Sequence, residues 1–230
     1  MEATLDAKTF DRLTRLIYEK AGIRLGAHKE ALVSARVGKR MRQLGIVDYG
    51  EYYKHLESDG SGAELVELLN VISTNVTHFF REPRHFDILA DRLKKWEDSG
   101  QTSFRLWSAA TSTGEEAYSM AMTVKEALRG TGNVRILATD LSTRVLKIAR
   151  AGEYEARHIE AVPKGLVSKY LHRRREDVAA CYAVADGIRS MVRFARLNLS
   201  QPPFPMKGPF DVVFCRNVMI YFDNEIRRKL

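Results

Sequence analysis

The stretch that decides the fold is Phe104-Arg-Leu-Trp-Ser-Ala-Ala-Thr-Ser-Thr-Gly-Glu-Glu-Ala-Tyr118. A short apolar run, 104–107, enters a loop of small polar residues, 108–114, and residues 115–128 then have the composition of a helix. This order predicts a strand, a loop and a helix, which together form the repeating unit of a parallel sheet. The loop contains one glycine, Gly114, instead of the three that a dinucleotide-binding loop requires.

The same alternation continues toward the C-terminus. Residues 134–138 predict a second strand that ends at Asp140, and residues 142–152 predict the helix that follows it. Residues 210–215 predict a third strand, and a further helix begins at Asn224. Because apolar strands alternate with helices, the fold class is α/β, with a parallel sheet covered by helices.

Residues 170–197 interrupt this alternation. Short β-prone pieces at 180–184 and 191–197 flank Asp186-Gly187, a dipeptide typical of tight hairpin turns. We therefore expect a small antiparallel β insertion at about 170–197.

The N-terminal third has a helical periodicity throughout. Apolar residues recur at helical spacing over 6–20, 31–44, 49–56 and 65–72. Gly22 and Gly45 follow the first two segments, as expected at helix ends. The sequence thus predicts a small all-helical domain over 1–72, followed by the α/β domain over 73–230.

Composition excludes several classes of protein. The 230 residues are 45% hydrophobic and 29% charged, which argues against a disordered chain, a collagen-like repeat or a membrane protein. No apolar run approaches the roughly 20 residues of a spanning helix. Residues 1–20 mix charges throughout, unlike a signal peptide, so we expect a cytoplasmic chain. We also expect Cys181 and Cys215 to be buried free thiols, and the scattered histidines predict no metal site.

The net charge of +8 is unevenly distributed. Residues 1–82 are balanced, so the excess lies in 83–230, yet the balanced part contains a strongly basic segment, 20–44. The second predicted helix carries a cluster of basic side chains: Arg36, Lys39, Arg40 and Arg42. Such a face is either simply solvated or complementary to an acidic partner. A nucleic-acid partner is disfavoured because no aromatic residues are interleaved in the cluster.

The residues that follow the first two strands indicate the kind of ligand. Ligands of open α/β sheets bind beyond the carboxyl ends of the strands. Glu115 and Glu116 begin the helix after the first strand, where they would repel a phosphate. S-adenosylmethionine fits this pattern because it is cationic and its ribose hydroxyls bind carboxylates. The alternatives are that both glutamates only stabilise the helix start and that Asp140 only caps the next helix.

The third strand is followed by Arg216 and Asn217, which suit recognition of a carboxylate or of a ligand edge. Methylases of nucleic-acid bases commonly have a Pro-Pro-aromatic segment after this strand. Here Pro202-Pro203-Phe204 precedes the strand, which weighs against a base methylase.

The chain carries five ordered motifs: Thr74–Glu82, Trp107–Tyr118, Asp140, Leu197–Leu199 and Phe214–Asp223. Together they resemble the chemotaxis receptor methyltransferases, the CheR family, over nearly the whole chain. The resemblance implies a Rossmann-like methyltransferase domain. It also implies S-adenosylmethionine-dependent methylation of glutamate side chains on the cytoplasmic helices of chemoreceptors, with S-adenosylhomocysteine as the second product. A non-catalytic signalling adapter that keeps the cofactor pocket is the alternative.

The resemblance also implies site residues. The expected cofactor contacts are Asn75, Thr77, Arg81, Glu115, Asp140, Asn198, Leu199, Arg216 and Asn217. Arg81 is expected to orient the acceptor carboxylate or the cofactor, and Tyr221 to line the methyl-transfer site, unless they serve ordinary capping and packing.

Two further expectations follow from the resemblance. The basic cluster on the second helix is expected to dock the acidic receptor helices, with the cytoplasmic protein recruited to membrane receptor arrays. The family continues past the Arg-Asn-Val-Met-Ile-Tyr motif with another helix and a closing antiparallel strand pair. We therefore expect the C-terminal strands to be missing from this chain.

Overall fold

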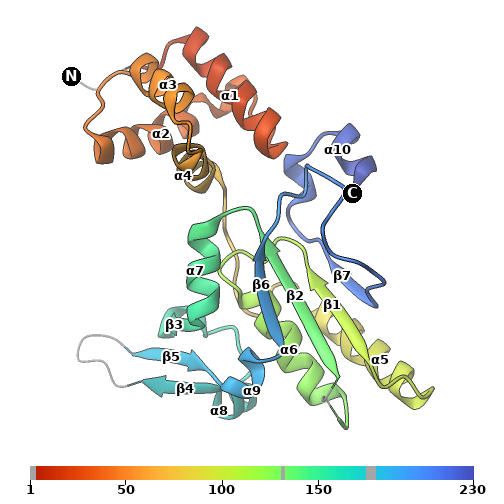
Figure 1. The fold of residues 1–230 in the computed structure, drawn as a ribbon. Helices are drawn as coiled ribbons and strands as arrows, with labels where there is room; N and C mark the ends of the chain where they lie inside the picture. Colours follow the sequence, from red (N-terminus) through yellow and green to blue (C-terminus); the bar gives the residue numbers. More distant parts are fainter. Residues whose placement is uncertain (1–3, 131–132, 175–179) are drawn as a thin grey trace.

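The computed structural model describes residues 4–130, 133–174 and 180–230. Figure 1 shows a helical domain at one end of an α/β domain, with the segment after α4 passing between them. The helical domain contains α1 (Ala7–Ala21), a 3-10 turn (Ala27–Lys29), α2 (Glu30–Leu44), α3 (Tyr49–Ser58) and α4 (Ala63–Ile72).

Local signals fix the ends of these helices. The Asp6 side chain caps α1 by accepting a hydrogen bond from the Thr9 amide, and Gly22 ends the helix at a φ of 68°. The apolar faces of the helices then meet in one core, in which Leu13, Ile17 and Leu68 are fully buried. The helical domain thus has a hydrophobic core of its own.

The main sheet of the second domain is parallel, with the strand order β6-β2-β1-β7. Its strands are β1 (Phe104–Ser108), β2 (Val134–Asp140), β6 (Val192–Arg196) and β7 (Val212–Phe214). Before and between them run α5 (Arg84–Asp98), α6 (Glu115–Ala127) and α7 (Thr143–Ala151). The predicted α/β class is confirmed. The chain proceeds from β1 toward β2 and β6 on one side and places β7 on the other, so the topological switch point lies at β1.

A second, antiparallel sheet has the order β3-β5-β4. It contains β3 (Glu153–Glu155), β4 (Leu171–Arg174) and β5 (Cys181–Val184), and the short helices α8 (Lys164–Tyr170) and α9 (Asp186–Arg189) flank it. The expected antiparallel insertion is therefore present.

The expected limits and turn of this insertion are wrong. The antiparallel sheet begins at Glu153, whereas Val192–Arg196 pairs in parallel with β2 in the main sheet. Asp186 and Gly187 form the first turn of α9. The Ala185 carbonyl accepts hydrogen bonds from the amides three and four residues later, those of Ile188 and Arg189. The connection between β4 and β5 contains residues 175–179, which lie outside the described part of the chain.

The C-terminal segment returns to the helical domain. It contains a 3-10 turn (Met219–Tyr221) and α10 (Asn224–Lys229), which lies beside the end of α1 in Figure 1. A Cβ at Gly22 would lie 2.6 Å from both Ile226 Cδ1 and Ser200 Cβ, so only glycine allows this approach. Cys181 and Cys215 are free thiols and partly buried, not fully buried as expected. In the described residues, no helix is long and apolar enough to cross a bilayer.

Candidate functional site

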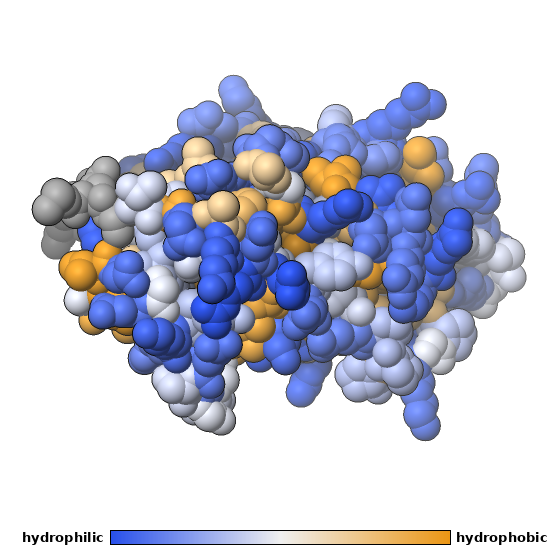
Figure 2. Space-filling view, turned by 90° about the horizontal axis from the view of Figure 1, so that it is seen from above, coloured by the Kyte–Doolittle hydropathy of each residue, from blue (hydrophilic) through white to orange (hydrophobic). Residues whose placement is uncertain are grey.

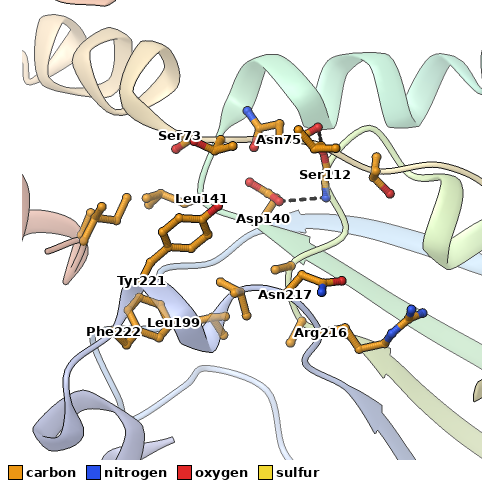
Figure 3. A pocket seen from close by; sticks show the side chains of 18 of the residues that line it. Ser73, Asn75, Ser112, Asp140, Leu141, Leu199, Arg216, Asn217, Tyr221 and Phe222 are labelled. Carbon is orange, nitrogen blue, oxygen red and sulfur yellow. Dashed lines mark hydrogen bonds between the residues drawn. The ribbon is translucent and has the colours of Figure 1, made fainter. Parts of the chain in front are cut away.

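A cavity lies between the helical domain and the carboxyl ends of β1 and β2. Figure 3 shows side chains from several segments converging on it, with Asp140 and Tyr221 on one side and Arg216 on another. The predicted site residues that line it are Asn75, Thr77, Arg81, Asp140, Asn198, Leu199, Arg216, Asn217 and Tyr221. The structure thus brings together residues that are far apart in the sequence.

Glu115 is the exception among the predicted contacts. Its side chain is 1% exposed and is turned away from the cavity, where it accepts a 2.6 Å hydrogen bond from Thr113 Oγ1 and lies 3.6 Å from His158 Nδ1. The neighbouring Glu116 lines the cavity instead. Successive residues of a helix point about 100° apart, so only one of two adjacent carboxylates can face the ligand. The sequence does not show which of the two it is.

Asp140 is buried at the end of β2 and is held from both sides. Its Oδ1 accepts a hydrogen bond from the Ser142 amide and its Oδ2 accepts one from the Ser112 amide, each 2.9 Å long. Figure 3 shows the second bond, and Ser112 Oγ donates in turn to the Asn75 carbonyl at 3.0 Å. Burial raises the pKa of Asp140, while these backbone hydrogen bonds oppose the shift. The carboxylate is therefore fixed in position and still has acceptor capacity for a ligand.

Glu116 faces Arg216 on the other side of the cavity. Glu116 accepts a 2.7 Å hydrogen bond from Ser108 Oγ, and Arg216 Nη1 lies 3.4 Å from its other oxygen. Burial raises the pKa of Glu116 to about 7, although Ser108 and Arg216 favour the charged form. The shift shows that the partners present do not fully compensate for the loss of water around this carboxylate.

Arg216 joins the cavity wall to the segment between the domains. Its Nη2 lies 3.2 Å from Glu82 and also donates to the Arg81 carbonyl. Its buried Nε has no hydrogen-bond partner among the described residues. A buried donor without a partner is costly, so this edge of the guanidinium is suited to a ligand carboxylate.

The backbone is strained around this cavity. Among the described residues, the non-glycine positions with left-handed φ angles are Phe80, Glu82, Ser112 and Asn217, at 52° to 56°. Such conformations are uncommon for residues with a Cβ and concentrate at functional sites. All four positions lie in motifs that were predicted to form the site.

Asn198 lines the cavity, but its carboxamide also connects the two domains. Nδ2 donates to the Lys20 carbonyl at 2.6 Å, and Oδ1 accepts hydrogen bonds from the Ser200 amide and hydroxyl. The Asn198 side chain therefore holds the helical domain against the cavity.

The basic cluster on α2 is only half exposed. Arg36 donates to the carbonyls of Ile72 and Ser73, and Arg40 pairs with the buried Glu64 at 2.6 Å. Lys39 and Arg42 are exposed. Two of the four side chains expected to bind a partner therefore also have partners within the helical domain, and the partner-binding role of the cluster stays a prediction.

Several residues that line the cavity are not predicted by the sequence. Ile23, Arg24 and Leu25 of the helical domain line the cavity, and the Arg24 amide donates to the Tyr221 carbonyl at 3.1 Å. No local pattern could reveal these contacts, because they join segments nearly two hundred residues apart. Glu116 was recognised within its motif but was not selected.

Comparisons with known proteins agree with this arrangement. The family model of the CheR methyltransferase SAM-binding domain matches residues 75–230, and that of the CheR all-alpha domain matches residues 8–73. The chemotaxis protein methyltransferase of Escherichia coli (strain K12) is 40% identical over 223 residues, which cover 96% of this chain and 76% of that protein. The chemotaxis protein methyltransferase of Borreliella burgdorferi is 40% identical over 227 residues, which cover 95% of this chain and 79% of that protein.

Proposed function

The chain belongs to the CheR methyltransferase family, and from this premise we propose that it methylates glutamate carboxylates on the cytoplasmic helices of chemoreceptors. The methyl donor is S-adenosylmethionine, and the products are glutamate methyl esters and S-adenosylhomocysteine. The observation that supports this proposal best is the cavity in which Asp140 and Glu116 face Arg81 and Arg216.

The charges in the cavity fit the cofactor. Asp140 would accept hydrogen bonds from the ribose hydroxyls, since both of its oxygens are already oriented by backbone amides. Glu116 would bind the ammonium group, and Arg216, with its unpaired Nε, would bind the carboxylate of the amino-acid part. The same cavity is poorly suited to a pyrophosphate, because Glu116 would repel it.

The reaction requires alignment more than proton transfer. When bound, S-adenosylmethionine supplies a methyl group on a sulfonium leaving group. A glutamate carboxylate has an ordinary pKa of about 4.3, so it is ionised at neutral pH and needs no general base. The work of the protein is to orient this carboxylate and to exclude water from it.

Arg81 and Tyr221 are the residues that we propose for this task. Both line the cavity. Arg81 Nη1 donates to the Val76 carbonyl at 2.9 Å, which fixes the guanidinium while its other N–H groups can bind the acceptor carboxylate. Tyr221 is held by the bond from the Arg24 amide to its carbonyl, so the helical domain fixes one wall of the methyl-transfer site.

We further propose that the helical domain, residues 1–72, docks the receptor. Lys39 and Arg42 remain exposed on α2 and would complement an acidic receptor helix. Figure 2 views the molecule from above, and hydrophilic residues predominate on this face, with hydrophobic ones in small separate areas. The exposed charges of Lys39 and Arg42 would then select an acidic receptor helix. The protein would work in the cytoplasm, recruited to membrane receptor arrays.

The test is a methyl-transfer assay with labelled S-adenosylmethionine and a receptor cytoplasmic fragment. We expect alkali-labile label on the fragment and none on a fragment in which the accepting glutamates are replaced by glutamine. Arg81→Ala should abolish transfer, whereas Arg15→Ala, on the exposed side of α1, should not. If calorimetry shows that the cofactor binds but no methyl group is transferred, the proposed enzymatic activity is contradicted and a signalling adapter is favoured.

A further inference from the structure

Asn70, on the last turn of α4, is a buried polar residue that the proposed reaction does not use. It is 1% exposed, and it faces the start of α7 in the other domain. Its Oδ1 accepts a 2.8 Å hydrogen bond from Ser142 Oγ and a 3.5 Å one from the Arg144 amide. Its Nδ2 donates to Thr143 Oγ1 at 3.1 Å and to Glu67 at 3.3 Å.

These contacts use the full hydrogen-bonding capacity of the carboxamide. The Arg144 amide can only donate, so the atom that faces it must be the oxygen, and the orientation of Asn70 is fixed. The Asn70 backbone carbonyl adds a further contact, because it accepts from Arg144 Nη2 at 3.2 Å. In Figure 1 the end of α4 lies next to the start of α7, in agreement with these bonds.

Ser142 links Asn70 to Asp140 through hydrogen bonds. Its hydroxyl bonds to Asn70 and caps α7, while its amide donates to Asp140 Oδ1 at 2.9 Å. The other oxygen, Oδ2, is bound by Ser112, whose hydroxyl donates to the Asn75 carbonyl (Figure 3). Both oxygens of Asp140 are thus held by residues whose hydroxyls bond to the helical domain or to the segment that follows it.

We propose that Asn70 is a positioning residue that sets the orientation of the Asp140 carboxylate through Ser142, so that recognition of the cofactor ribose depends on the docked helical domain. The proposal rests on the proposed role of Asp140 in binding S-adenosylmethionine. It extends that role, because a residue of the receptor-docking domain then contributes to cofactor affinity without touching the cofactor.

The test begins with Asn70→Ala and with S-adenosylhomocysteine as the calorimetric probe. Losing the carboxamide leaves the proton of the Ser142 hydroxyl without its acceptor and frees the turn that carries the Ser142 amide. We expect the Kd for S-adenosylhomocysteine to rise about tenfold. In the ligand-free protein, the Ser142 amide should exchange its hydrogen faster than in the wild type, which is a readout that needs no cofactor.

Ser142→Ala examines the same link from its other end. If both residues act through one hydrogen bond, the double variant should bind S-adenosylhomocysteine no more weakly than the weaker single variant. Effects that multiply in the double variant would show that Asn70 acts by a different route and would overturn the proposal.

The matched control is Tyr52→Phe, which removes a buried hydrogen bond to Glu64 within the same helical domain. It should lower the thermal midpoint and leave the S-adenosylhomocysteine Kd unchanged. An equal loss of affinity in Tyr52→Phe, or wild-type affinity in Asn70→Ala, would overturn the positioning role. Failure of the wild-type protein to bind S-adenosylhomocysteine would instead contradict the proposed function.

Discussion

Glu64 in the helical domain and Glu116 in the cavity are both buried carboxylates that face an arginine, and they differ in how completely they are paired. Glu64 is 5% exposed, receives hydrogen bonds from Arg40 at 2.6 Å and Tyr52 at 2.8 Å, and its amide is capped by Asp59. Glu116 is 13% exposed, and among the described residues its side chain has one hydrogen bond, from Ser108, beside Arg216 at 3.4 Å.

The pKa values follow this difference. Burial alone would raise the pKa of Glu64, but the hydrogen bonds from Arg40 and Tyr52 outweigh it and bring the pKa below its ordinary value. The partners of Glu116 do not outweigh burial, and its pKa rises to about 7. Glu64, which holds the helical domain together, is thus fully paired, whereas Glu116, for which we propose a cationic ligand, is only partly paired.

The largest expected effect on stability comes from removing Glu64, the fully paired carboxylate. Glu64→Ala leaves the guanidinium of Arg40 and the hydroxyl of Tyr52 without their partner inside the helical domain. Removing one member of a buried ion pair destabilises a protein by about 4 kcal/mol. Urea unfolding should show this loss. If the double variant Glu64→Leu/Arg40→Met is as unstable as Glu64→Ala, the loss does not come from the unpaired charge.

Glu116→Gln should change how stability depends on pH. Between pH 4.5, the ordinary pKa, and about 7, the folded wild type keeps a proton that the unfolded chain releases, so its stability falls as the pH rises through this window. The fall should be about 3 kcal/mol and should be absent in Glu116→Gln. Unfolding of both proteins across this range measures the difference. Parallel pH profiles would show that Glu116 is paired as completely as Glu64.

Two hydroxyl deletions with smaller expected effects compare the hydrogen bonds of Glu64 and Glu116 directly. Tyr52→Phe and Ser108→Ala each remove one hydroxyl that donates to a buried glutamate. Tyr52→Phe should cost about 2 kcal/mol at neutral pH, because it removes a hydrogen bond to a charged carboxylate. Ser108→Ala should cost less at pH 6, where Glu116 is largely protonated, and more at pH 8. Chemical unfolding at the two pH values separates these outcomes, and equal costs would argue against a protonated Glu116.

The smallest expected effect is a linked proton. If Glu116 binds the ammonium group of the cofactor, binding lowers its pKa and releases about half a proton per ligand at pH 7. Calorimetry of S-adenosylhomocysteine in two buffers with different ionisation enthalpies measures this release. Glu116→Gln should abolish it, while Glu64→Gln should not affect it.

The parts of the fold that depend on local signals were predictable. The helices of the N-terminal domain and the strands that begin at Phe104 and Val134 follow from hydrophobic periodicity and end at the expected residues within a few positions. No element was predicted over Arg84–Asp98, although Phe86, Leu89 and Leu93 have helical spacing and form the buried face of α5. This helix was missed although its signal is present.

Features that depend on pairing across the chain were not predictable. Asp186-Gly187 has the local chemistry of a hairpin turn, but the strand that follows pairs with the distant β2 and α9 forms instead. The choice between Glu115 and Glu116 depends on how α6 is rotated against the sheet, which no spacing reveals. The motifs predicted the residues that line the cavity from the α/β domain. The lining residues of the helical domain could be found only in the folded structure.

The contact between α1 and the C-terminal segment has a consequence for folding. The Asn198 carboxamide bonds to a carbonyl 178 residues earlier in the chain, and the Tyr18 hydroxyl bonds to Asp223, 205 residues later. Contacts of such large sequence separation form slowly, because the loop that they close must be ordered first. During synthesis the helical domain can build its own core early and can meet the start of α7, but its contacts with residues 198–223 must wait until that segment has left the ribosome. We therefore expect the cavity to be the last part of the protein to form, and the nascent chain to gain affinity for the cofactor only at that stage.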